Sequence, residues 1–267
     1  MAPDSAYTTP PCDAVKGVYN PTIELVAVQI RAIKGDWRRS AQKLDELLAP
    51  LGTASLIVCP EMALTGYVFP NPGAARMVAE ASDGGPTFEL ASRFAKRHHA
   101  YFVIGYPEAG PDGRLFNSAM IFDPNGRQLL NYRKRLLYDQ DETWAQPGDT
   151  EYPLIETPFG LLTAGICMDL NDDAFIDHLF DARPDVVAFP TNWLDQNFDV
   201  RLYWRWRLQG YPCWLVAANT YGVEEGIPFR GRSAILRPDG QTVAAAPAMG
   251  DRLIAAAAQP ARPWEIG

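Results

Sequence analysis

The sequence is poor in the residues that build disulfides and metal sites. Its 267 residues include four cysteines, which lie far apart, and three histidines. The histidines do not stand at the spacing of a metal-ligand motif, so we expect no metal. Scattered, unpaired cysteines are typical of a reducing compartment, which predicts a cytoplasmic protein.

The chain also lacks a surplus of positive charge and any long apolar run. Lys and Arg number 24 against 32 Asp and Glu, which gives a formal net charge of −8. Nucleic-acid binding needs a basic face, so we expect no nucleic-acid partner. No run approaches the roughly 18 apolar residues of a membrane span, and we expect no membrane partner. The first residues have neither the basic start nor the apolar stretch of a secretory signal.

What the chain does have is the composition of an ordinary globular protein. Hydrophobic residues make up 47% of it, and about 250 residues suffice for a single α/β domain. Residues 1–21 contain prolines without periodicity and are predicted to form an N-terminal arm. Residues 22–260 are predicted to form the domain, and residues 261–267 a C-terminal tail.

Apolar periodicity predicts strands that alternate with helices, with two hairpins in between. The predicted strands are 23–30, 54–61, 101–106, 161–167, 186–189, 214–218 and 252–258. The predicted helices are 37–48, 88–95, 171–182 and 200–209, and the hairpins are 115–133 and 232–246. Such alternation indicates an α/β fold with sheets inside and helices outside.

Three of the predicted strands end in a residue that can take part in chemistry. These residues are Glu61, Lys134 and Cys167, and sites in α/β sheets gather at strand ends. Singly, each has an ordinary explanation as a solvated cap or a buried thiol. Together they fit amide hydrolysis, in which a thiol attacks the carbonyl carbon. A carboxylate carries the proton to the leaving ammonia, and a cation stabilises the oxyanion.

Several segments resemble the signature regions of the nitrilase, or carbon–nitrogen hydrolase, superfamily. They are Cys-Pro-Glu-Met-Ala-Leu-Thr-Gly-Tyr at 59–67, Tyr-Arg-Lys at 132–134 and Gly-Ile-Cys-Met-Asp at 165–169, with further matches at 190–193 and 229–240. They follow the order of the family. The resemblance implies a four-layer α-β-β-α sandwich, a homodimer or higher homo-oligomer, and no metal or organic cofactor.

The resemblance also implies roles for individual residues. Glu61 matches the general base, Lys134 the cation beside the oxyanion and Cys167 the nucleophile. The backbone N–H of Met168 would complete the oxyanion hole, because it directly follows the nucleophile. Glu142 matches a second glutamate that positions the substrate and the lysine, although a loop carboxylate is the alternative.

Three further residues are candidates for the substrate site. Asn192 and Trp193 follow a predicted strand end and are expected to line the site. Asp169 opens an acidic segment beside the nucleophile, which suits a substrate that carries a free amine. The alternative is that the acidic segment caps a helix N-terminus, where Asp and Asn are favoured.

The segments 132–145 and 167–171 resemble the protein N-terminal amidase branch of the family. That resemblance implies hydrolysis of the side-chain amide of an N-terminal Asn or Gln to a carboxylate and ammonia. Asp169 and Glu142 are the candidates for holding the α-amine of such a substrate.

Two other functions stay open. One is a small aliphatic or ω-amide amidase, or an N-carbamoyl-amino-acid hydrolase, on the same triad. Its carboxylate clamp would come from Arg201, Arg205 and Arg207. The other is a binding module without catalysis, which the complete set of Glu, Lys and Cys disfavours.

Overall fold

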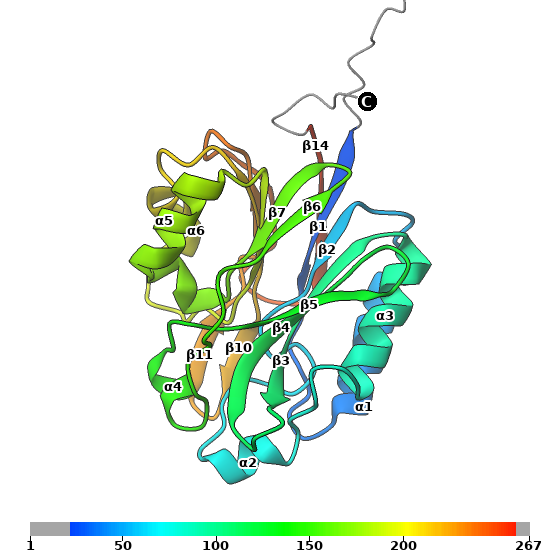
Figure 1. The fold of residues 1–267 in the computed structure, drawn as a ribbon, viewed down its shortest axis with the longest axis vertical. Helices are drawn as coiled ribbons and strands as arrows, with labels where there is room; N and C mark the ends of the chain where they lie inside the picture. Colours follow the sequence, from blue (N-terminus) through cyan, green and yellow to red (C-terminus); the bar gives the residue numbers. More distant parts are fainter. Residues whose placement is uncertain (1–21, 260–267) are drawn as a thin grey trace, which may run out of the picture.

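The computed structural model describes residues 22–259 and shows a sandwich of four layers (Figure 1). Two six-stranded sheets face each other, and helices cover the outer side of each sheet. The four-layer α-β-β-α prediction is therefore confirmed. Within the described residues, no helix combines the length and apolarity needed to cross a membrane.

The first sheet has the strand order β14-β1-β2-β3-β4-β5. β1, β2 and β3 are parallel neighbours, whereas β14, β4 and β5 pair antiparallel at the flanks. The strands are β1 Ile23–Gln29, β2 Leu56–Val58, β3 Tyr101–Ala109, β4 Leu115–Phe122, β5 Gln128–Arg133 and β14 Arg252–Ala258. The helices of this half are α1 Trp37–Leu48, α2 Pro72–Arg76, α3 Pro86–His98 and α4 Asp139–Glu142.

The second sheet has the order β13-β12-β9-β8-β7-β6, with β7, β8 and β9 parallel. Its strands are β6 Leu154–Thr157, β7 Gly160–Ala164, β8 Val186–Pro190, β9 Trp214–Ala218, β12 Ala234–Leu236 and β13 Thr242–Ala245. The helices of this half are the 3₁₀ helix η1 Cys167–Asn171, α5 Asp173–Ala182 and α6 Val200–Arg207. A separate hairpin joins β10 Tyr221–Glu224 to β11 Ile227–Arg230.

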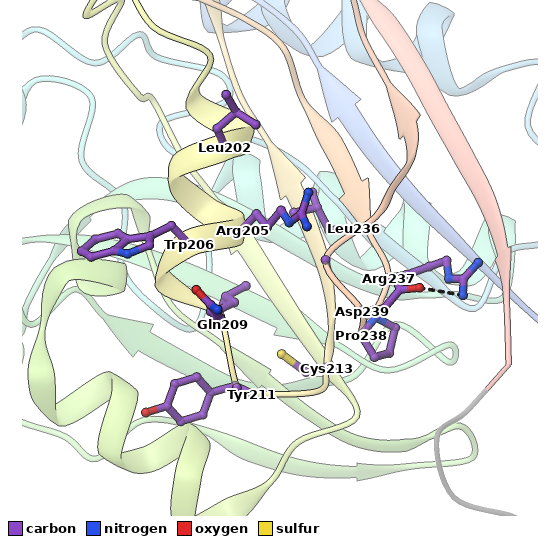
Figure 2. Close-up of a pocket in the computed structure, with 13 residues that line it drawn as sticks. Leu202, Arg205, Trp206, Gln209, Tyr211, Cys213, Leu236, Arg237, Pro238 and Asp239 are labelled. Atoms are coloured by element: carbon purple, nitrogen blue, oxygen red, sulfur yellow. Dashed lines mark hydrogen bonds and ion pairs between the residues drawn. The ribbon is translucent and has the colours of Figure 1, made fainter.

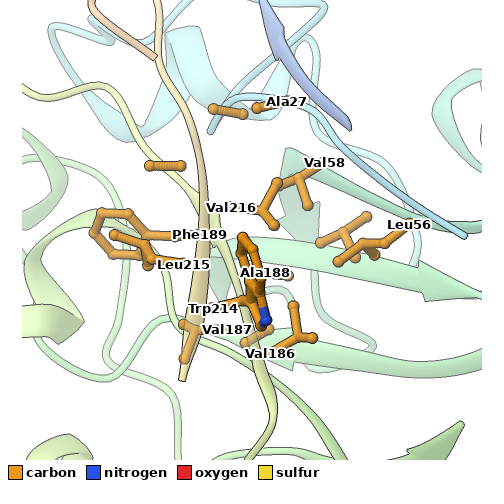
Figure 3. Packing of buried hydrophobic residues seen from close by; sticks show 14 of the residues in the cluster. Ala27, Leu56, Val58, Val186, Val187, Ala188, Phe189, Trp214, Leu215 and Val216 are labelled. Atoms are coloured by element: carbon orange, nitrogen blue, oxygen red, sulfur yellow. The ribbon is translucent and has the colours of Figure 1, made fainter. Parts of the chain in front are cut away.

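The space between the two sheets is filled by apolar side chains (Figure 3). Ala27, Leu56 and Val58 of the first sheet belong to one cluster with Val187 and Val216 of the second, and all five are fully buried. A second cluster packs α1 and α3 against the outer face of the first sheet. Because both faces of the sheets are covered, the central strands are apolar without alternation.

Most of the predicted elements are present, and the differences concern short segments. β2 ends at Val58 and β7 at Ala164, so the chain leaves each sheet before the chemical residues of the strand ends. The periodicity did not predict α2, α4, β6, η1 and the β10–β11 hairpin. Each of these elements has only four or five residues, which is too few for a period to show. The predicted arm 1–21 and tail 261–267 lie outside the described residues.

Candidate active site

Three strand ends from the two sheets bring the predicted chemical residues to one place. Glu61 lies three residues after the end of β2, and Cys167 lies three residues after the end of β7. Lys134 directly follows β5, and its Nζ donates to Oε1 of Glu61 at 2.9 Å. Glu61 and Lys134 both act electrostatically on the thiol of Cys167. The structure therefore groups the three side chains that the sequence singled out.

Lys134 is a buried ammonium held between two buried carboxylates. Its Nζ contacts Glu61 at 2.9 Å and Oδ2 of Asp141 at 2.5 Å, and all three side chains have no exposed surface. Burial alone would lower the pKa of Lys134, but the charges of Asp141 and Glu61 outweigh burial and hold that pKa well above its ordinary value. Burial raises the pKa of Glu61, and Lys134 opposes that rise. The lysine therefore stays charged, and the glutamate binds a proton more readily than an exposed glutamate does.

The prediction for Glu142 is wrong in its placement. The side chain of Glu142 is exposed, whereas its neighbour Asp141 is buried and bonded to Lys134. The helix α4 is a single turn, in which the side chain of residue 141 is buried and that of residue 142 points outward. Asp141 also accepts the backbone N–H of Tyr138, which fixes the carboxylate at the start of this turn. The second acid of the site is therefore Asp141.

Cys167 sits at a sharp turn of the backbone at the floor of a pocket. Its φ of 47° is in the left-handed region, which non-glycine residues seldom adopt. Burial raises the pKa of the thiol, and the charge of Glu61 raises it further. Lys134, the Thr191 hydroxyl and the backbone of Asn192 act in the opposite direction. The thiol therefore holds its proton more tightly than an exposed cysteine does.

The pocket above the thiol has a volume of about 370 Å³. Five of its eleven lining residues are aromatic, and three carry side-chain amides. The lining residues are Tyr67, Tyr138, Cys167, Met168, Asn171, Asn192, Trp193, Leu194, Gln196, Phe198 and Tyr203. Such a concave, mainly apolar space with a few polar groups is the usual form of a small-molecule site.

Met168, Asn192 and Trp193 lie where the sequence placed them, at the pocket. The backbone N–H of Asn192 donates to Oε2 of Glu61 at 2.9 Å, and its side-chain amide donates to the Glu61 carbonyl at 2.7 Å. Asn192 thereby ties the end of β8 to the loop that follows β2. The role of the Met168 backbone in an oxyanion hole stays a prediction.

Asp169 does not reach the pocket, which is contrary to the prediction that it holds an amine. Its carboxylate is fully buried. It accepts hydrogen bonds from the Tyr132 hydroxyl and from the backbone N–H groups of Ile166, Arg135 and Leu136, at 2.7–3.0 Å. Burial raises the pKa of Asp169 to about 6, and these donors oppose the rise. The carboxylate fastens the turn at Cys167 to the loop that carries Lys134.

This role of Asp169 predicts a loss of stability when the acceptor is removed. In Asp169→Asn the amide NH₂ faces N–H donors that have lost their acceptor. We therefore expect the free energy of unfolding to fall by about 3 kcal/mol. Urea denaturation measures the change. Asp173→Asn, at a side chain that is 97% exposed, is the control and should change it by less than about 0.5 kcal/mol. Equal effects of the two variants would contradict the anchoring role.

The arginines of the alternative function do not line the pocket. Arg201 pairs with Asp199 at 2.5 Å, and Arg207 donates to the Leu170 carbonyl at 2.8 Å. Arg205 lies at another pocket of about 520 Å³, between α6 and the turn after β12 (Figure 2). No arginine is among the described residues that line the pocket above Cys167, where it could clamp a carboxylate.

Several residues of the site were not predicted from the sequence. Tyr67 forms part of the pocket wall. Burial raises the pKa of its hydroxyl, and the negative charges of Asp141 and Glu61 raise that pKa further. Its backbone N–H donates to Glu224 of the β10–β11 hairpin at 3.0 Å. Gly66 must be glycine here, because its φ is 81° and a Cβ would lie 2.9 Å from that carboxylate. The only sequence signal for Tyr67 was its place in the 59–67 motif.

Among residues 22–259, no group of three His, Cys, Asp or Glu side chains could hold a metal ion. The charged groups around Cys167 bind one another, and their chemistry is that of proton transfer and charge stabilisation. These groups fit an acyl-transfer site in which protein side chains do the chemistry.

The two-sheet sandwich with a thiol, a carboxylate and a lysine at its strand ends defines a class of hydrolase. A family model described as Carbon-nitrogen hydrolase matches residues 25–263. The chain belongs to the carbon-nitrogen hydrolase family and is an enzyme that hydrolyses carbon–nitrogen bonds.

Similar proteins support this assignment. A Pseudomonas protegens protein named "Hydrolase in pqqF 5'region" is 32% identical over 87% of this chain and 81% of its own length. The protein N-terminal amidase of Saccharomyces cerevisiae is 29% identical over 69% of this chain, which spans 49% of the yeast protein. A crystal structure of an N-terminal amidase with an Asn-Glu-Ala peptide has a TM-score of 0.80 at 18% identity, over 90% of this chain and 98% of that one, and is similar in fold.

Proposed function

We propose that this enzyme is a thiol amidohydrolase that works through a thioester on Cys167. The observation that carries the proposal is the buried chain of contacts from Asp141 through Lys134 to Glu61, beside a thiol at the floor of a pocket. A buried carboxylate with a raised pKa and a fixed cation are the two groups that acyl transfer from an amide needs beside a nucleophile.

The reaction follows from these positions. The Cys167 sulfur attacks the carboxamide carbon as Glu61 takes the thiol proton. Lys134 and the backbone N–H of Met168 stabilise the oxyanion. Glu61 then gives the proton to the departing ammonia, which leaves a thioester. Glu61 next takes a proton from water, the resulting hydroxide equivalent cleaves the thioester, and the returned proton regenerates the thiol with release of the carboxylate product.

For the substrate, we propose the side-chain amide of an N-terminal Asn or Gln. The segments 132–145 and 167–171 favour this choice, and two similar proteins are named protein N-terminal amidase. With Asp169 buried elsewhere, the α-ammonium would be held by the side-chain carbonyls of Asn171 and Gln196 and by the faces of Trp193 and Tyr203. The second candidate is a small aliphatic or ω-amide, or an N-carbamoyl amino acid, on the same triad. The uncharged lining accommodates a neutral amide, whereas no arginine lines the pocket to bind the carboxylate of a carbamoyl amino acid.

Peptides that begin with Asn or Gln separate these substrates. We expect ammonia release from the free peptides and at least about tenfold less from the same peptides after N-acetylation, because acetylation removes the cation that the rings attract. Coupled detection of ammonia measures both rates, with Cys167→Ala as the blank. Equal rates on free and acetylated peptides would overturn the N-terminal substrate. Turnover of simple aliphatic amides alone would favour the second candidate.

Two other expectations stay predictions. They are the cytoplasmic location and the homodimer or higher homo-oligomer. For the latter, Phe180 on α5 and Leu202 and Trp206 on α6 are apolar side chains that are at least 60% exposed. They would form the contact through the outer helix layer.

A further inference from the structure

One polar side chain contacts both carboxylates of the site from behind. β4 is fully buried along its length, yet it carries Asn117 in its apolar run. The side-chain nitrogen of Asn117 donates to Oε1 of Glu61 at 2.6 Å and to Oδ1 of Asp141 at 2.9 Å. Its backbone carbonyl accepts the N–H of Lys134 at 2.8 Å. A single residue thus touches the two acids and the backbone of the lysine between them.

The contacts of Asn117 come at a cost that a purely structural residue would avoid. Its side-chain oxygen is buried and has no hydrogen-bond partner. A buried acceptor without a donor costs about 1–3 kcal/mol. An apolar residue of similar size at this position would avoid that cost. The two hydrogen bonds that the Asn117 side chain donates therefore explain why an asparagine stands at this position in place of an apolar residue.

We propose that Asn117 is a positioning residue that holds Glu61 and Asp141 as two separate, charged acceptors on either side of Lys134. The inference rests on the proposed function, in which Glu61 is the base. Asn117 does not line the pocket, so it acts on the substrate only through these carboxylates. It supplies two donors without adding a charge, which neither an aspartate nor a leucine can do.

The charged groups around Asn117 explain why an uncharged donor at position 117 matters for the protonation of Glu61. Glu61 after β2, Lys134 after β5, Asp141 on α4 and Cys167 on η1 all interact electrostatically. The hydrogen bond from Asn117 lowers the pKa of Glu61 and so opposes the effect of burial. A third carboxylate here would repel both acids and force a shared proton onto them. Glu61 would then be protonated, and unable to act as a base, at a higher pH than in the wild type.

The test is the pH dependence of alkylation of Cys167 by iodoacetamide, followed by mass spectrometry. Glu61 takes the thiol proton in this reaction also, so the acidic limb of the profile reports its protonation. In Asn117→Asp we expect the limb to move up by about one pH unit, which slows alkylation on that limb about tenfold. In Asn117→Leu, which removes the donors without adding a charge, we expect a smaller shift in the same direction.

Asn131 provides a matched control on the neighbouring strand β5. Its side-chain nitrogen donates to the buried carboxylate of Glu108 at 2.7 Å, and its oxygen accepts from the Tyr106 hydroxyl at 2.9 Å. Asn131→Asp therefore also puts a new carboxylate beside a buried one, but away from Lys134. We expect its alkylation profile to match that of the wild type.

Each result decides the proposal. Folded Asn117 variants with the wild-type profile would overturn it, and so would an equal shift in Asn131→Asp. If Asn117→Asp does not fold, Asn117→Leu decides. Loss of folding in both, with Asn131→Asp folded, would make Asn117 a structural residue. Because alkylation needs no amide turnover, a shifted profile without hydrolysis of any amide would refute the proposed function and leave this inference standing.

Discussion

We expect Cys167→Ala to abolish amide hydrolysis and to leave the protein folded. The variant lacks the nucleophile of the proposed mechanism, so the rate should fall by on the order of 10⁴-fold or more. The side chain is small and lies at the pocket floor, so the free energy of unfolding should change by less than about 1.5 kcal/mol. Ammonia release and urea denaturation of the same preparation measure the two effects.

The other buried thiols provide the controls for this variant. Cys59 and Cys213 are buried, and burial raises the pKa of each, of Cys213 to about 12. Cys59→Ala and Cys213→Ala should therefore keep wild-type activity within about threefold, apart from any loss of folded protein. Activity that survives in Cys167→Ala and disappears in Cys59→Ala would refute the assignment of the nucleophile.

We expect Lys134→Met to reduce both stability and activity. It leaves Glu61 and Asp141 buried without their shared cation, and breaking a buried ion pair in this way costs about 3–5 kcal/mol. Loss of the oxyanion-side charge should lower the rate by roughly 100- to 1000-fold. Chemical denaturation and ammonia release measure these effects. Lys43→Met, which removes a half-buried partner of Asp251, should cost less than about 1 kcal/mol.

The pH dependence of stability should change in the same variant. In the wild type, the raised pKa of Lys134 adds stability that is present below the ordinary lysine pKa and is lost only as pH rises through the folded-state value. Without the lysine, two buried carboxylates compete for one proton, which the folded state then binds more tightly than the unfolded state. Lys134→Met should therefore gain stability as pH falls from 7 towards 5. If Lys134→Met were as stable at pH 7 as the control Lys43→Met, this account would be contradicted.

The sequence was a good guide where a strand could be predicted directly before a chemical residue. Glu61 and Cys167 follow apolar strands, Lys134 follows the second strand of a predicted hairpin, and strand ends converge in this class of fold. The sequence was a poor guide to the second acid. Choosing between Asp141 and Glu142 requires the phase of a one-turn helix, and four residues contain no period from which to read that phase.

Asp169 shows a second limit of sequence reasoning. The sequence shows an acidic residue beside Cys167, but it does not show which groups donate hydrogen bonds to its carboxylate. Three of these, Tyr132, Arg135 and Leu136, lie 33–37 residues earlier in the chain. From the sequence alone, a carboxylate whose hydrogen-bond donors lie far away in the chain cannot be distinguished from one that is free to bind a substrate.

Asn117 could be singled out from the sequence, because an amide side chain within an apolar strand needs hydrogen-bond partners. The sequence does not say which residues these partners are.

The two halves of the site come from different sheets of the sandwich. Glu61 and Lys134 follow strands of the first sheet, and Cys167 follows a strand of the second. Cys167 and Glu61 are thus brought together by the apolar layer that joins the sheets and by the hydrogen bonds that Asn192 and Asp169 make across it. A collapsed chain with both sheets formed but not yet docked would have nearly all its secondary structure and no active centre. Enzymatic activity is for this reason a readout of sheet docking.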